Sequence, residues 1–126
     1  MKQLTPRFRG MALCACVVGL LGCNKATDPR VDASRPLEQS FQSAEPATQQ
    51  ALAAVKAGLQ NGNYVEAARA VQPVLTGRNL TPQQRQAVGL MFQQISQAVA
   101  ANPSLDSPEL YELRVKLAKA ARGERF

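Results

Sequence analysis

The sequence predicts a small all-α domain. From Leu37 onward apolar residues recur at intervals of three and four, the spacing that places them on one face of a helix. No stretch alternates between apolar and polar residues as a half-buried strand would. Turn and capping residues divide this periodic region into segments of helical length. We therefore predict a bundle of four main helices at about residues 46–61, 64–76, 82–101 and 108–122, with a short helix near 37–44.

The positions of proline and glycine predict where the first two helices begin and end. Leu37, Phe41 and Ala44 form a short apolar stripe that stops before Pro46, because the residue preceding a proline disfavours the helical conformation. Pro46 suits the first turn of the next helix. Gly62 should end that helix by taking the left-handed C-cap conformation.

The third segment, 64–76, contains one feature that does not suit a helix. Asn63 is a favourable N-cap, and Gly77 should close the segment. Pro73 removes a backbone donor and crowds the preceding turn, so we expect a kink or an early end there. The residues expected to face inward are Tyr64, Ala67, Ala68, Val71, Val74 and Leu75.

The last two helices have the clearest start signals. Thr81 as N-cap, Pro82 at the first helical position and Gln84 two residues later form a capping box, and Ser107-Pro108 repeats the start signal. The predicted buried stripes are Val88, Met91, Phe92, Ile95 and Val99 in the first of these helices and Leu110, Leu113, Leu117, Ala120 and Ala121 in the second.

The first 22 residues have the pattern of an export signal. Lys2, Arg7 and Arg9 precede an uncharged run at 11–21, which is much shorter than the roughly 20 apolar residues of a membrane-spanning helix. Directly after it, Leu20-Leu21-Gly22-Cys23 resembles the lipobox of bacterial lipoproteins. The resemblance implies cleavage before Cys23, a diacylglycerol thioether on its sulfur and fatty acylation of the new amino terminus. A secretory signal with a chance cysteine and a short membrane anchor are the alternatives.

These observations divide the chain into three parts. Residues 1–22 are the predicted lipoprotein signal peptide, 23–36 are the lipidated cysteine with a polar flexible linker, and 37–126 are the helical domain. The alternative for the linker is an irregular loop packed on the domain. Asn24 stands where many inner-membrane lipoproteins carry aspartate, so the resemblance favours the periplasmic face of the outer membrane.

Composition weighs against several classes of function. The predicted mature chain has 12 basic and 9 acidic side chains, which is too balanced for a nucleic-acid-binding protein. Two of the three cysteines leave with the signal peptide, Cys23 is consumed by lipid, and the sequence contains no histidine. The carboxylate pairs Glu109 with Glu112 and Asp28 with Asp32 fit a helix start and a linker. We therefore predict no enzyme activity, no cofactor and no metal site.

Residues 49–75 also show a limited resemblance to one tetratricopeptide hairpin. Gly62-Asn63-Tyr64 followed by Ala67 is similar to the turn between the two helices of that repeat, where a small alanine allows the helices to approach. Val55 stands where the family has a smaller residue, and no second copy follows. The resemblance implies a single helical hairpin without the peptide-binding groove of a repeat array.

The predicted function is that of a lipid-anchored helical adaptor or scaffold in a bacterial envelope, bound to the membrane through Cys23 and to an unidentified protein partner. The candidate contact residues are Tyr64, Phe92 and Tyr111, which would border an exposed apolar patch. A pilotin-like escort of a secretion or pilus subunit and a structural spacer are the alternatives. Glutamine-rich helix faces and the basic run Arg114, Lys116, Lys119, Arg122 and Arg125 are either solvated or further contact surfaces.

Overall fold

The computed structural model describes residues 31–126, and this part of the chain folds into five α-helices and one short 3₁₀-helix, without strands. The prediction of an all-helical domain is confirmed for these residues. The elements are α1 (Ser34–Ser40), α2 (Pro46–Gln60), α3 (Tyr64–Leu75), α4 (Pro82–Ala101), η2 (Pro103–Leu105) and α5 (Pro108–Ala121).

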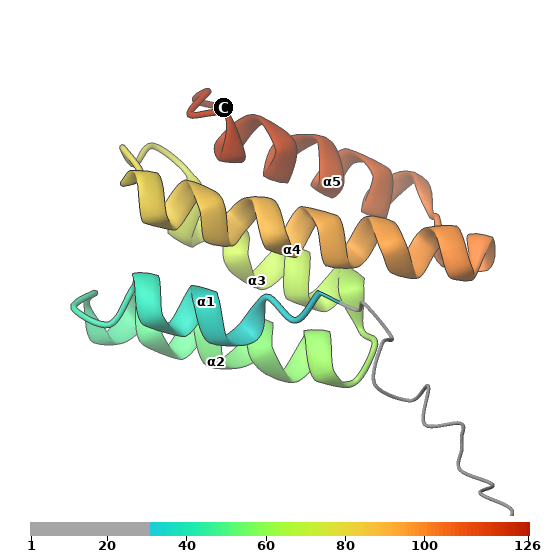
Figure 1. The fold of residues 1–126 in the computed structure, drawn as a ribbon, viewed down its shortest axis with the longest axis horizontal. Helices are drawn as coiled ribbons and strands as arrows, with labels where there is room; N and C mark the ends of the chain where they lie inside the picture. Colours follow the sequence, from blue (N-terminus) through green and yellow to red (C-terminus); the bar gives the residue numbers. More distant parts are fainter. Residues whose placement is uncertain (1–30) are drawn as a thin grey trace, which may run out of the picture.

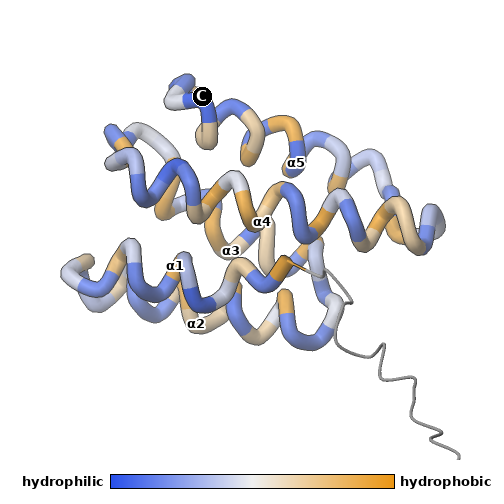
Figure 2. Tube along the Cα trace, in the orientation of Figure 1, coloured by the Kyte–Doolittle hydropathy of each residue, from blue (hydrophilic) through white to orange (hydrophobic). Residues whose placement is uncertain are grey.

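The helices pack in a closed circuit around one core. Helix α1 contacts α2 and α4, α2 contacts α3, α3 contacts α5, and α5 returns to α4. In the view of Figure 1, α1 and α2 lie along the bottom, α5 lies along the top, and α4 crosses in front of α3 between them. Each helix carries both apolar and polar residues (Figure 2), as expected when one face of each helix packs against the core and the opposite face is polar. The largest fully buried side chains are Leu37, Val55, Val71, Val74, Val88, Met91, Ile95, Leu110 and Leu117.

Helices α2 and α3 approach each other closely at Gly58. A Cβ atom added to Gly58 would lie 2.8 Å from Ala67 Cβ and 2.9 Å from Ala67 N, so only glycine fits at this position. Ala67 is fully buried. The predicted role of Ala67 in close helix packing is therefore confirmed, but its partner Gly58 was not identified from the sequence.

The turn between these helices confirms the predicted stop signal. Gly62 has φ of +73°, a left-handed conformation that favours glycine. The Asn63 N–H donates to the Gly58 carbonyl (2.7 Å) and the Gly62 N–H to the Leu59 carbonyl (3.4 Å), which is the Schellman arrangement. Asn63 occupies the predicted N-cap position of α3, but its side chain makes no capping bond. Its backbone joins the two helices instead.

Helix α3 does not end early at Pro73. It continues to Leu75, with Pro73 inside the helix, and the Thr76 N–H bonds to the Gln72 carbonyl. Pro73 is exposed, while its neighbours Val74 and Leu75 are buried in the core. Burial of these two side chains offsets the hydrogen bond that the proline cannot donate.

The start of the domain also differs from the prediction. The short helix spans Ser34–Ser40, not 37–44, and Ala33 and Ser34 are buried. Residues 31–36 therefore belong to the folded domain and not to the predicted linker. Asp32 Oδ1 accepts a hydrogen bond from the Ser34 N–H (3.0 Å), and this side chain-to-backbone turn precedes the helix. The rest of the predicted linker, the signal peptide and the lipobox lie outside the described residues.

Helices α4 and α5 begin as predicted. Thr81 Oγ1 accepts from the Gln84 N–H (3.1 Å), and Gln84 Oε1 accepts from the Thr81 N–H (3.0 Å), completing the capping box. Ser107 Oγ accepts from the Leu110 N–H (3.1 Å). These bonds satisfy backbone donors that the first turn of a helix leaves free. The two helix starts that the sequence marked most clearly are thus confirmed.

Candidate interaction surface

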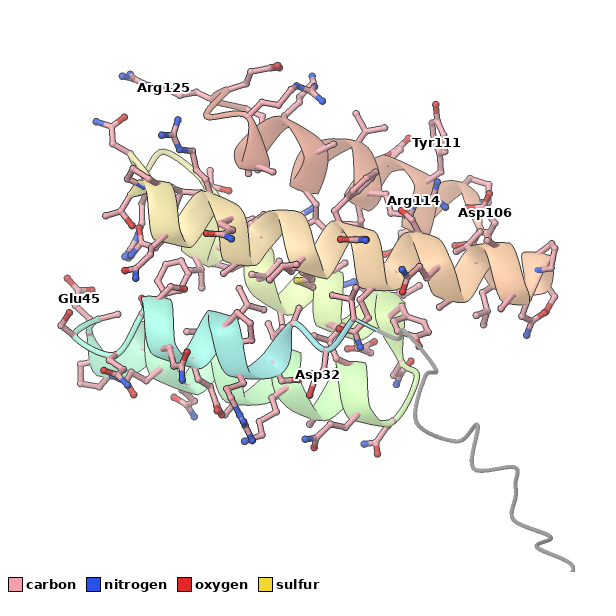
Figure 3. All side chains as sticks on the ribbon, viewed as in Figure 1. Asp32, Glu45, Asp106, Tyr111, Arg114 and Arg125 are labelled. Carbon is pink, nitrogen blue, oxygen red and sulfur yellow. The ribbon has the colours of Figure 1, made fainter. Side chains whose placement is uncertain are left out.

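The outer face of α5 carries the exposed large apolar side chains of the described residues. They are Tyr111 and Val115, with 57% and 38% of their surface exposed. The two residues are four apart, so they lie on the same side of the helix, opposite Leu110, Leu113 and Leu117 in the core. Tyr111 points away from the bundle in Figure 3.

The other two candidate contact residues lie elsewhere. Tyr64 and Phe92 are partly buried and pack against the core from α3 and α4. Each lies three or four residues from core positions of its own helix, which draws its ring inward. Tyr111 alone of the predicted three is exposed. Val115 was missed because a single valine among polar residues gives no distinct signal in the sequence.

The basic run of α5 divides into paired and unpaired cations. Arg114 lies 3.3 Å from Asp106, and both side chains are close together in Figure 3. Arg122 Nε donates to Glu124 Oε1 (2.7 Å), which raises the pKa of Arg122 and lowers the pKa of Glu124. The other three cations of this run have no carboxylate at ion-pair distance among the described residues: Lys116, Lys119 and Arg125.

Two of the four carboxylates considered as catalytic or cation-binding pairs, Glu109 and Asp32, have structural contacts. Glu109 accepts from Arg69 Nε (3.2 Å), joining α5 to α3, and this hydrogen bond raises the pKa of Arg69. The bond from the Ser34 N–H holds the pKa of Asp32 below its ordinary value. Asp28 lies outside the described residues. Over residues 31–126 no group of three or more histidine, cysteine, aspartate or glutamate side chains could hold a metal.

Several glutamines fix α1 to the rest of the domain. Gln94 Oε1 accepts from the Ala33 N–H (2.9 Å) and Gln97 Oε1 from the Val31 N–H (3.4 Å). Gln84 Nε2 donates to the Ser40 carbonyl (3.2 Å) at the other end of α1. The glutamine-rich side of α4 therefore contacts the entering chain and is not simply solvated.

Two open grooves flank α1. The groove between α1 and α2 has a volume of about 490 Å³, and its lining includes Glu38, Phe41 and Gln49. The groove between α1 and α4 has a volume of about 240 Å³ and is lined by Pro36, Gln39, Ser40, Gln83, Gln86, Ala87 and Leu90. Both offer side-chain amides beside small apolar areas, and the groove between α1 and α2 also offers the Glu38 carboxylate, which is suited to hydrogen bonding with a protein surface.

No helix in the described part of the chain has the length and apolar character needed to cross a membrane. The predicted lipidation site, Cys23, and the lipobox residues Leu20, Leu21 and Gly22 are not among those described. Comparisons of this chain with protein families, with curated proteins and with solved structures find no match.

Proposed function

We propose that this protein is a lipid-anchored adaptor of a bacterial envelope, held on the membrane through Cys23, with its helical domain contacting a protein partner. The observation that carries the anchor is Leu20-Leu21-Gly22-Cys23 after a basic and then apolar leader. One fatty chain holds a protein only weakly, at about 0.8 kcal/mol per buried methylene, whereas two or more give a stable anchor.

The start of the folded domain supports a position close to the lipid surface. Val31 already bonds to α4 through Gln97, and it is eight residues after Cys23. Eight residues span at most about 28 Å when fully extended. An anchored Cys23 therefore confines the domain to the immediate neighbourhood of the membrane, where a partner would also be found.

The grooves beside α1 support the adaptor role. Both expose glutamine side chains next to apolar groups, with Glu38 added in the groove between α1 and α2, and such mixed surfaces are typical of protein interfaces that form and dissociate. The chemistry favoured by the described residues is recognition and not catalysis, and we propose that the protein is not an enzyme.

Metabolic labelling with palmitate tests the anchor. The parent protein should incorporate label and fractionate with membranes. The Cys23→Ser protein should be unlabelled and should not mature to the membrane-bound form. An unlabelled parent, or a Cys23→Ser protein that matures and fractionates like the parent, would show that the anchor is absent.

Crosslinking in cells followed by mass spectrometry tests the adaptor role separately. We expect a reproducible partner with crosslinks to α1 or α2, for example at Lys56, and Lys56→Arg should lose only the crosslinks made through that amine. If the protein is labelled and membrane-bound but no partner is crosslinked reproducibly, the proposed lipid anchor is supported and the proposed adaptor role is refuted.

A further inference from the structure

The outer face of α5 combines exposed apolar side chains with four basic side chains, three of which have no carboxylate at ion-pair distance among the described residues. Tyr111 and Val115 lie along one side of the helix, and Lys119 and Arg122 continue that side toward the C-terminus. Lys116 and Arg125 flank it (Figure 3 shows Arg125 directed outward at the end opposite Tyr111). Against these four cations stand Glu112 and Glu124, the second paired with Arg122. The face is net positive.

The described chain begins at the end of the bundle that carries Tyr111. Gly89 of α4 lies opposite Ala121 of α5, so in the antiparallel pair the C-terminal part of α4 lies beside the N-terminal part of α5. Val31 bonds to Gln97 in that part of α4. The chain therefore enters the domain at the end of the bundle where Tyr111 is found (Figures 1 and 3).

The chain between Cys23 and Val31 is long enough for α5 to lie flat on the lipid. Packed helices are about 8–10 Å apart, so passing α4 and α5 from the Val31 side takes roughly 20 Å. The eight residues from Cys23 reach about 28 Å at most. The anchor can thus enter the bilayer beside α5, but it cannot hold the domain far from the surface.

We infer that the outer face of α5 binds the surface of the membrane that carries the anchor, with Tyr111 and Val115 at the headgroup level and Lys116, Lys119, Arg122 and Arg125 contacting anionic phospholipid. Tyrosine is well suited to the membrane interface because its ring is apolar and its hydroxyl is polar. Basic side chains near anionic lipid add an attraction that falls off within a Debye length. This inference rests on the proposed anchor.

The orientation complements the proposed adaptor function. Helices α1 and α2 lie on the side of the bundle away from α5 (Figure 1). With α5 on the lipid, the two grooves beside α1 are left free for a protein partner.

Cysteine accessibility on vesicles tests the orientation. The lipidated full chain carrying Val115→Cys is reconstituted into vesicles of phosphatidylcholine alone or with phosphatidylglycerol, and labelled with a water-soluble maleimide. The matched control is Ala53→Cys, at an exposed position of α2. We expect phosphatidylglycerol to slow labelling at Val115→Cys, and high salt to restore it, while Ala53→Cys is unaffected.

Charge variants test the cause of this protection. Lys116→Gln and Lys119→Gln should each weaken the phosphatidylglycerol-dependent protection about fivefold, whereas Lys56→Gln on α2 should leave it unchanged. If lipidation is intact but Val115→Cys is labelled at the same rate on both kinds of vesicle, the proposed orientation is wrong and the proposed anchor is unaffected. Protection in cells but not on these vesicles would also overturn it and assign the face to a protein. Absence of lipid on Cys23 would overturn both proposals.

Discussion

At the scale of single residues, Gly58 determines how closely α2 and α3 pack. An added Cβ would meet Ala67 Cβ, Ala67 N and the Asn63 carbonyl at 2.8 to 3.0 Å, and two of these are backbone atoms that cannot move without displacing α3. Gly58→Ala should therefore lower the free energy of unfolding by about 1–3 kcal/mol, as overpacking usually does. Denaturant unfolding followed by circular dichroism would measure it.

Gly89 provides the control for this substitution. It is also inside a helix, but an added Cβ would meet only Ala121 Cβ, at an ordinary 3.7 Å. Gly89→Ala should be neutral or stabilising by about 0.4–1 kcal/mol, because alanine reduces the entropy of the unfolded chain. Equal destabilisation by both substitutions would show that the close approach at Gly58 does not set the effect.

Asp32 should make stability depend on pH at the acidic end. The hydrogen bond from the Ser34 N–H holds its pKa in the folded domain below the unfolded value near 3.8. The charged carboxylate therefore stabilises the fold above the unfolded pKa, and this contribution is lost as pH falls through the lowered folded pKa. The difference in unfolding free energy between the parent and Asp32→Asn should shrink as pH decreases below about 4. A difference that grows in acid would contradict the assignment.

At the scale of elements, α1 is the part of the domain held most by side chain-to-backbone hydrogen bonds. The chain segment that leads into α1 is buried at Ala33, and the Ala33 N–H donates to Gln94 Oε1. Gln94→Ala should leave that donor unsatisfied and cost about 1–3 kcal/mol. Hydrogen exchange should show the loss as faster exchange in α1, with α3 and α5 much less affected.

Gln93 is the matched control for Gln94. It is the adjacent residue of α4, is exposed and takes no part in the bonds to α1. Gln93→Ala should leave exchange in α1 unchanged. Uniformly faster exchange across the domain in Gln94→Ala would mean that α1 does not open separately from the rest.

At the scale of the whole molecule, helix existence could be predicted from the sequence, while the contacts between helices could not. Thr81 with Gln84, and Ser107, marked two helix starts correctly because capping depends on residues within one turn. The start of α1 was placed too late because it depends on Gln94 and Gln97, which are about 60 residues away. At the contact between α2 and α3, Ala67 was identified from the sequence but its partner Gly58 was not, because the contact depends on how the two helices pack.

The candidate surface was predictable only in part for the same reason. Tyr111 could be identified as an aromatic residue on a largely polar helix face, but exposure of Tyr64 and Phe92 depended on which neighbours covered them. The pairing of Glu109 with Arg69 likewise required the arrangement of α3 and α5. The anchor, by contrast, is proposed from adjacent residues alone.

Intact-mass measurement of the protein extracted from the membrane fraction tests the lipid anchor most directly. We expect a chain that begins at Cys23 and carries the added mass of a diacylglyceryl group on its sulfur, with or without a further acyl group at the amino terminus. A mass equal to that of the unmodified polypeptide, with or without residues 1–22, would contradict it.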